Sequence, residues 1–443
     1  MSGHAVDYKA TLNSIPNRII PQNVKIACYV GIAFGVAVTA YGLFGGDPNL
    51  KHETHGAFIT NFMYWNGIAM GGFIFSAIGM VTYARWQKRF KRISEAFAMF
   101  LPISFALLML FLVTGGIDVY PWADDPGSLP AHKKAYFQIP FFYARVVIGL
   151  GLMAILSYLF VQRSLRADLG VAKEKMEEMG LTVPASWESK IGGWKGSETE
   201  VKNAQSYMLT LAPIIIYLYT LVYSMLAVDI SMSLAPHWFA NMFPAWYFMS
   251  AGWSGLVWTA IIALTCGEWL GIRHLLRPKD FHDIGKLTFA FCMFWGYTTF
   301  AHYLPIWYGN MTEEIGFILY RTHSETFSQF TIITVVICFL APYVILISRG
   351  IKKLPKAYLA VTILIAIGIW MERYIVNMPS VHSYHMPETG LPFGIIEIGM
   401  TLGFLGAFLL TVLGFLSKYP AAVLSDPYME NDPDHIEIHP EHH

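Results

Sequence analysis

The sequence predicts an all-α integral membrane protein with about ten transmembrane helices and both termini in the cytoplasm. Of its 443 residues, 55% are hydrophobic and only 14% are charged, whereas soluble domains carry about 25% charged residues. The mean hydropathy is +0.46. The apolar residues gather in stretches of roughly 20, the length that a helix needs to cross a bilayer. Lysine and arginine are also divided unequally between alternate loops.

Ten apolar stretches reach this length. Tryptophan and tyrosine crowd several of their ends, as in the aromatic belts of membrane proteins. We expect spans near residues 23–45, 57–84, 95–117, 138–161, 206–228, 244–266, 287–305, 327–347, 356–377 and 393–416.

The direction of these spans follows from their loops. Of the 30 lysines and arginines, 24 fall on the side of the N-terminus, four fall on the other side, and Arg145 and Arg373 lie inside spans. Because cytoplasmic loops carry the excess of positive charge, we expect both termini in the cytoplasm. No apolar signal segment precedes the first span, so we expect no cleavable signal peptide.

The chain then divides into a cytoplasmic N-terminal segment at 1–22, a transmembrane domain at 23–416 and a cytoplasmic tail at 417–443. The loop at 162–205 mixes seven basic with seven acidic residues and is expected to be a solvated cytoplasmic connector. The tail is acidic and contains histidines. A weak metal site, a disordered tail and docking onto a neighbour are all compatible with it.

A faint internal repeat relates residues 62–122 to residues 244–308. Each unit contains a helix, a basic loop, a second helix and an aromatic end, "GIDVYPW" in one and "AHYLPIWY" in the other. The units are four spans apart and share one orientation. This predicts two four-helix bundles, made of spans 2–5 and spans 6–9 and flanked by the first and last spans.

Small residues form two ridges along the expected spans. Gly67 and Gly71 make a GxxxG pattern in the second span, and Gly399, Gly403 and Ala407 continue along the last. Such ridges let two helices approach closely, within one chain or between partners.

Ionisable residues inside spans are costly and usually functional. Seven lie in the outer part of the expected membrane: Asp118, Arg145, Asp229, His302, Glu372, Arg373 and Glu397. A carboxylate–arginine–histidine cluster could bind a polar head group and relay protons. Alternatively, these residues are structural bridges between helices, with an arginine paired to an aspartate or glutamate. His302 fits either a proton-exchanging imidazole or a hydrogen-bonded packing residue.

A smaller group lies on the cytoplasmic side and could extend a proton path across the membrane. Its members are Glu268, His274, His282, Asp283 and Lys286. An ordinary wet loop explains the same residues equally well.

The sequence lacks the motifs of several common cofactor and metal sites. The four cysteines are widely spaced, so we expect no iron–sulfur or structural zinc site. There is no phosphate-binding loop, dinucleotide fingerprint or reliable metal-ligand spacing, and zero net charge does not favour nucleic acid. A redox role would therefore need a lipid-soluble reductant such as a quinol, and a partner to receive its electrons. A quinol also loses protons when oxidised, which needs an acid/base site near one membrane face.

Four long motifs carry a family resemblance: "RISEAFAMFLP" with "YPW" (92–102 and 120–122), "HKKAYFQIPFFYAR" (132–145), "DISMSLAPHWFANMFPAWYF" (229–248) and "HDIGKLTFAFCMFWGYTTFAHYLPIWYGNMTEE" (282–314). Through them the chain resembles the NrfD-like family, the membrane subunits of the polysulfide reductase type. It is most similar to the ActF-like subunits of bacterial alternative complex III. The resemblance extends over nearly the whole chain.

This resemblance implies ten helices in two four-helix bundles, in the bacterial cytoplasmic (inner) membrane. It implies a respiratory complex that oxidises menaquinol and passes electrons to a cytochrome c or an oxidase. The implied partners are a sister NrfD-like subunit, a periplasmic iron–sulfur subunit and multihaem cytochrome c subunits. In such complexes the sister subunit is the better-supported quinol site, while the ActF-like subunit offers proton paths and structural pairing. Menaquinone and lipids are the implied small molecules.

Three positions depart from the family pattern. Ile230 follows Asp229 where a tryptophan is usual, Ala235 stands where an acid is common, and His302 replaces a residue of a Ser-Gln pair. A shifted proton route, or a complex with another electron acceptor, therefore stays open. Two other functions stay open as well: a stand-alone proton-coupled transporter, and a structural membrane anchor of another iron–sulfur or molybdopterin-type oxidoreductase.

Overall fold

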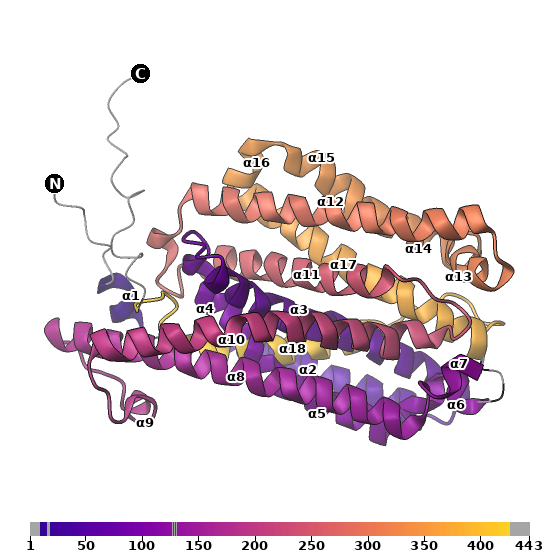
Figure 1. Cartoon of the computed structure of the whole chain (residues 1–443), viewed down its shortest axis with the longest axis horizontal. Helices are drawn as coiled ribbons and strands as arrows, with labels where there is room; N and C mark the ends of the chain where they lie inside the picture. Colours follow the sequence, from indigo (N-terminus) through magenta and orange to yellow (C-terminus); the bar gives the residue numbers. More distant parts are fainter. Residues whose placement is uncertain (1–8, 16–17, 126, 128, 130, 426–443) are drawn as a thin grey trace.

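The computed structural model describes residues 9–15, 18–125, 127, 129 and 131–425, and all regular secondary structure in them is helical (Figure 1). The α-helices are α1 (Lys9–Ser14), α2 (Gln22–Phe44), α3 (Pro48–Val81), α4 (Lys88–Phe97), α5 (Leu101–Val113), α6 (Pro121–Asp124), α7 (Ala131–Lys134), α8 (Ile139–Glu178), α9 (Glu188–Ile191), α10 (Ser197–Leu226), α11 (Phe243–Cys266), α12 (Pro278–Gly309), α13 (Thr312–Thr322), α14 (Ser328–Val335), α15 (Ala341–Ile347), α16 (Arg349–Lys353), α17 (Pro355–His385) and α18 (Ile395–Lys418). Short 3₁₀ or π turns join several of them: η1 (Ala98–Phe100), η2 (Gly116–Val119), η3 (Ala185–Trp187), η4 (Ala227–Ser231), η5 (Met232–Leu234), η6 (Arg273–Leu275) and η7 (Val336–Leu340).

Nine of the described helices, or runs of joined helices, are long and apolar enough to cross a membrane. They are α2, α3, α4 with α5, α8, α10 with η4 and η5, α11, α14 with α15, α17 and α18. The chain thus has the structure of an all-α, multi-pass membrane protein. The tenth expected span, 287–305, lies within α12, which is long enough but less apolar than the nine. Nine of the ten expected spans therefore coincide with such a helix among the described residues, and α12 contains the tenth.

Helix α3 lies at the centre of the molecule and is buried over most of its length. It contacts α4, α5, α10, α11, α17 and α18. Helices α8 and α10 pack along each other on one side of it, and α12, α14 and α15 lie on the other side, against α11 and α17. The first and last expected spans, α2 and α18, share the most extensive contact of any two helices.

Both ridges of small residues lie at helix crossings. A Cβ atom placed on Gly71 would lie 2.2 Å from the carbonyl oxygen of Ala251, and one on Gly255 would lie 2.0 Å from the backbone nitrogen of Gly72. In the same way, a Cβ on Gly35 would lie 2.7 Å from the Cα of Gly403. No larger side chain fits at these crossings, so glycine allows α3 to touch α11 and α2 to touch α18 backbone to backbone.

The connector expected at 162–205 is shorter in the structure. Helix α8 continues to Glu178 and α10 begins at Ser197, so only residues 179–196, with the short α9, connect them. Part of the extension is buried, and there Asp168 pairs with Arg92 of α4. The helix stops where Gly180 adopts a left-handed conformation and Leu181 donates to the carbonyl oxygen of Met176, at 2.8 Å, which is a common glycine-based helix end.

The loops that are rich in lysine and arginine lie at one end of the helices, together with α1 (Figure 1). We call this the basic end, and the other, which carries α6, α7 and α13, the opposite end. Arg18 ties the N-terminal segment to the basic end: its guanidinium donates to the carbonyl oxygens of Leu416, Tyr419 and Leu270. Burial lowers the pKa of Arg18 to about 10, so it stays charged at neutral pH. The four histidines of the tail, after residue 425, lie outside the described residues.

The α3–α11 crossing predicts the effect of one added methyl group. Gly255→Ala places a Cβ into the backbone of α3 and should destabilise the fold by about 1–3 kcal/mol, the usual cost of overpacking. The matched control is Gly414→Ala on α18, where no atom lies within 4 Å of the added methyl. Thermal unfolding in detergent, followed by tryptophan fluorescence, measures both. Equal melting temperatures for the two variants would contradict the close crossing.

Candidate functional site

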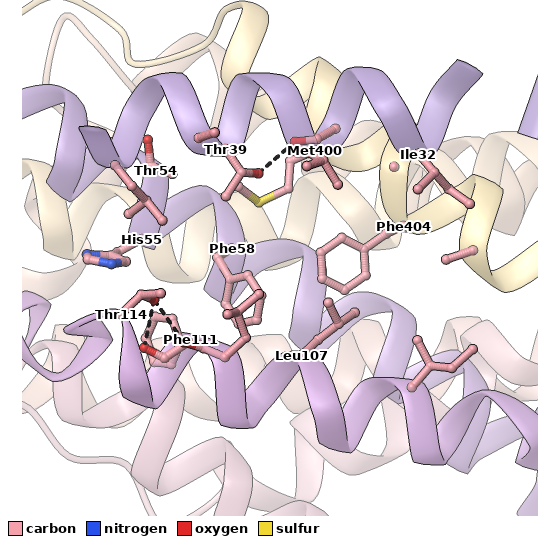
Figure 2. A pocket seen from close by; sticks show the side chains of 18 of the residues that line it. Ile32, Thr39, Thr54, His55, Phe58, Leu107, Phe111, Thr114, Met400 and Phe404 are labelled. Atoms are coloured by element: carbon pink, nitrogen blue, oxygen red, sulfur yellow. Dashed lines mark hydrogen bonds between the residues drawn. The ribbon is translucent and has the colours of Figure 1, made fainter. Parts of the chain in front are cut away.

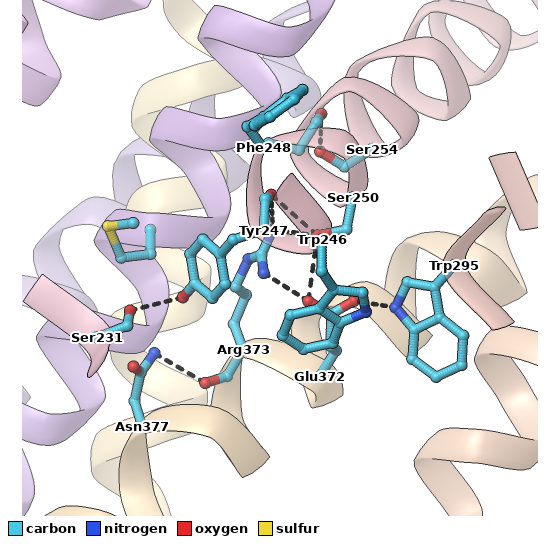
Figure 3. Close-up of polar contacts among 12 residues, drawn as sticks. Ser231, Trp246, Tyr247, Phe248, Ser250, Ser254, Trp295, Glu372, Arg373 and Asn377 are labelled. Carbon is cyan, nitrogen blue, oxygen red and sulfur yellow. Dashed lines mark hydrogen bonds and ion pairs between the residues drawn. The ribbon is translucent and has the colours of Figure 1, made fainter. Parts of the chain in front are cut away.

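Two consecutive residues of α17, Glu372 and Arg373, form a charged pair that is buried among α11, α12 and α17. Arg373 donates through Nη1 to Oε1 of Glu372 and through Nη2 to the hydroxyl of Ser250, at 2.6 Å. The other carboxylate oxygen of Glu372 accepts from Trp295 Nε1 at 2.6 Å (Figure 3). Three helices therefore hold this carboxylate in one orientation.

Tyr247 of α11 completes the support of the arginine. Its ring centre lies 3.6 Å from the guanidinium carbon of Arg373, and its backbone carbonyl accepts from Nη2 at 3.1 Å. The Tyr247 hydroxyl pairs with Ser231 Oγ at 2.8 Å (Figure 3). Isolated charges are expensive away from water, and this ring and these hydrogen bonds compensate part of that cost.

Beside Glu372 lies a cavity of about 170 Å³ that is mostly walled by apolar and aromatic side chains. Glu372, His302, Trp246 and Trp295 all line it. The His302 ring stands edge-on to Trp246, with ring centres 5.5 Å apart. Its Nε2 atom is buried and makes no hydrogen bond with the described residues. His302 thus keeps one ring nitrogen without a partner among the described residues, on the wall of the cavity.

Chemically, this cavity offers a carboxylate and an imidazole on an apolar wall. Both groups can accept a proton from a hydroxyl that comes within hydrogen-bond distance. The indole nitrogen of Trp295 and the guanidinium of Arg373 donate to the carboxylate of Glu372 and offset part of the cost of burying it. The site can therefore bind a ring that carries hydroxyl groups and exchange protons with it.

Arg145 and Asp229 form a separate pair between α8 and η4. Arg145 donates from Nε and Nη2 to the two oxygens of Asp229, at 3.0 and 2.9 Å, and from Nη1 to the carbonyl of Tyr136. Its guanidinium also lies over the rings of Tyr136 and Phe141. A two-pronged pair with these further partners has the geometry of a structural tie.

Asp118 and Glu397 lie elsewhere. Asp118 pairs with Lys51 at 3.0 Å where both side chains are well exposed. Glu397 is buried in the first turn of α18, where its carboxylate accepts from the backbone nitrogen of Gly394 at 2.8 Å, and it interacts with the side chain of Glu53. The seven residues of the expected outer layer therefore form separate groups. The cavity brings together His302 and Glu372, and Arg373 pairs with Glu372 without lining the cavity.

The candidates expected on the cytoplasmic side gather around the start of α12 at the basic end. Asp283 pairs with Lys286 at 2.7 Å, and His282 Nδ1 lies 3.9 Å from the same carboxylate. Glu268 and His274 are exposed in the preceding loop. This is the geometry of a solvated surface, and the structure does not connect it to the cavity.

A buried ionic network at the basic end escaped the sequence-based list. Arg92 bridges Glu95 of α4 and Asp168 of α8, all three fully buried. Glu95 also accepts from Ser164 Oγ at 2.7 Å, and Asp168 accepts from the backbone nitrogens of Leu424 and Ser425. The one sequence signal for this network is the run of basic residues beside Glu95, and such a run is typical of a solvated loop.

Arg321, which lies between the spans expected at 287–305 and 327–347, is also buried and lines the cavity. Its guanidinium donates to the carbonyl oxygens of Ile375 and Val376 and to Ser380 Oγ. It fixes α13 against α17 and so closes one wall.

No three metal-ligating side chains lie together among the residues that the structure describes, and the four cysteines are free. Nothing in this part of the chain thus indicates where a resident metal ion would be held.

The Arg145–Asp229 pair predicts that substitutions of its two residues have strongly non-additive effects on stability. Arg145→Met and Asp229→Asn each leave one charged group buried without its partner and should cost roughly 3–5 kcal/mol. The double variant should cost clearly less than the sum of the two. Thermal unfolding of the three variants in detergent measures this. Strictly additive losses would show that the pair does not act as a unit.

No protein-family model matches this chain, and no curated protein matches it. The resemblance to NrfD-like subunits rests on the quoted motifs alone, and the function it implies is a proposal.

Proposed function

We propose that this chain is a membrane subunit of a respiratory quinol-oxidising complex of the alternative complex III type, in a bacterial cytoplasmic membrane. It would supply a quinol-associated cavity and a proton route, while partner subunits carry the electrons to a cytochrome c or an oxidase. The observation that supports this best is the aromatic cavity that His302 and Glu372 both line.

The shape of the cavity suits the head of a quinol. Its volume of about 170 Å³ has room for a ring but not for a long isoprenoid tail. Two lining residues, Tyr303 and Val335, are 42% and 37% exposed, so the cavity opens sideways to the surroundings of the helices. A tail could leave through this opening into lipid.

The chemistry suits oxidation of a quinol. Each hydroxyl must lose a proton as electrons leave, and a carboxylate or imidazole within hydrogen-bond distance is the group that accepts it. The sequence carries no motif for a redox cofactor of its own. The electrons would therefore pass to partners, for which the family resemblance suggests a sister NrfD-like subunit, a periplasmic iron–sulfur subunit and multihaem cytochromes c.

The arrangement of helices is compatible with the expected bundles. Helices α3, α4 with α5, α8 and α10 contact one another in sequence, as do α11, α12, α14 with α15, and α17. We propose that these are two four-helix bundles, with α2 and α18 beside them. The cavity then lies within the second bundle, towards the periplasmic face.

His302 tests the function. His302→Phe keeps a packed ring but removes the proton-exchanging nitrogens, so quinol oxidation by the purified complex should fall by about two orders of magnitude, as for loss of a general base. The matched control is His237→Phe, which alters an exposed histidine outside the cavity. Quinol-dependent reduction of cytochrome c measures both. Normal turnover in a fully assembled His302→Phe complex would leave only a structural role.

The proposed orientation, with both termini in the cytoplasm, predicts which loops are accessible from outside the cell. A cysteine at Gly390, in the exposed loop before α18, should react with a membrane-impermeant maleimide on intact spheroplasts. A cysteine at Ser186, exposed in the α8–α10 connector, should react only after lysis. The parent chain, whose four cysteines are largely buried, provides the blank. The reverse pattern would place the termini outside.

A further inference from the structure

A second cavity lies on the other side of α3, in a groove between α2, α3, α5 and α18 (Figure 2). Its volume is about 490 Å³, and its walls are almost entirely apolar. Three lining residues, Val36, Phe44 and Leu110, are strongly exposed on the outside of the helices. The groove therefore opens sideways, where a hydrophobic ligand could enter from lipid. None of its lining residues lines the cavity at Glu372.

The groove contains one polar group that the structure leaves unsatisfied. His55 of α3 is 2% exposed, lines the groove, and makes no hydrogen bond from either ring nitrogen with the described residues. A buried polar group without a partner costs on the order of 1–3 kcal/mol. In Figure 2 the imidazole lies at one end of the groove, beside Thr54 and Thr114.

The other polar side chains of the wall are already occupied. The hydroxyls of Thr39, Thr54 and Thr114 each donate to a backbone carbonyl one helical turn earlier. The lining contains no lysine, arginine, aspartate or glutamate. Among the described residues, a ligand would thus meet one free imidazole in an otherwise apolar groove, which disfavours a phosphate or another charged head.

Aromatic rings surround this polar point. Phe111 meets the His55 ring edge-on at 5.6 Å, and Phe58 and Phe111 stack at 4.9 Å with an angle of 6° between their planes. Flat rings next to one hydrogen-bonding group favour a flat ring that carries a hydroxyl or carbonyl oxygen. The remaining length of the groove suits an aliphatic tail.

We infer that this groove binds a quinone or quinol, with the ring oxygen on His55 and the tail along α2 and α18 towards its lateral opening. Lys51 lies one helical turn before His55 on α3 and pairs with Asp118 of η2. The ring of the bound quinone would therefore lie near the opposite end of the helices. The inference takes the same ligand class as the proposed function but rests on different residues. Either can fail while the other stands.

Photolabelling tests the site. The full-length protein in lipid nanodiscs is irradiated with an azido-benzoquinone that carries a decyl tail, and the labelled peptides are identified by mass spectrometry. Competition with unlabelled decyl-benzoquinone gives the apparent affinity. We expect label on α3, α5 or α18. Label confined to α12, α13 and α17 would overturn the groove while supporting the proposed function.

Three variants sharpen the result. His55→Phe preserves the ring but removes both hydrogen-bonding nitrogens, so the affinity at the groove should fall roughly five- to tenfold. His237→Phe, outside the groove, should leave it unchanged. Leu107→Trp fills the groove from α5 without touching His55 and should abolish groove labelling, which keeps the test decisive if His55→Phe folds poorly.

Two outcomes would overturn the inference. One is an unchanged affinity in a folded His55→Phe protein. The other is a phospholipid that native mass spectrometry finds retained by the parent chain and lost from Leu107→Trp, and that the benzoquinone does not displace. The groove would then be a lipid site.

Discussion

Backbone contact between α3 and α11 fixes the position of both cavities. Water is absent around membrane-spanning segments, so helices there associate through close packing and buried hydrogen bonds rather than through a hydrophobic driving force between them. Gly71 and Gly255 let the two helices touch where a Cβ would collide with backbone atoms of the other helix. One side of this crossing carries Tyr247 and Ser250, which hold Arg373. The far side of α3 carries His55 and the groove.

The buried charges differ in how fully neighbouring groups compensate them. This difference distinguishes ion pairs with a structural role from a pair that can also meet a ligand. Arg145 and Asp229 satisfy each other through two hydrogen bonds, with aromatic rings beneath the guanidinium, and neither lines a cavity described above. Glu372 is paired as well, yet it lines the cavity that His302 also lines. An ion pair that is sealed on all sides fixes helices. A pair with one open side can also meet a ligand.

The sequence predicts the course of the helices far better than the partners of their charges. Apolar length locates the spans, and small-residue spacing marks the crossings at Gly71 and Gly403. The expected second span begins at residue 57, however, while α3 begins at Pro48, so His55 was not recognised as part of a helix. Apolar length finds the lipid-crossing stretch, but a helix continues wherever its backbone is satisfied. Glu95 and Asp168 were missed for a different reason, because the contact of Arg92 with Asp168 joins residues far apart in sequence.

Helix α12 shows why a mean hydropathy below that of the other spans does not exclude a lipid-facing helix. It is less apolar than the nine spanning helices, but its charged residues, Lys279, Asp280, Asp283 and Lys286, all lie in its first third. The rest of its exposed face is largely aromatic, including Tyr297, Phe300, Tyr303, Trp307 and Tyr308. Tyrosine and tryptophan score as only weakly hydrophobic because each carries a polar atom, yet they are enriched where lipid meets water. The residues that lower the hydropathy of α12 are therefore compatible with a lipid-facing surface. The same composition lets α12 supply Trp295 and His302 to a cavity that a purely aliphatic helix could not equip for proton exchange.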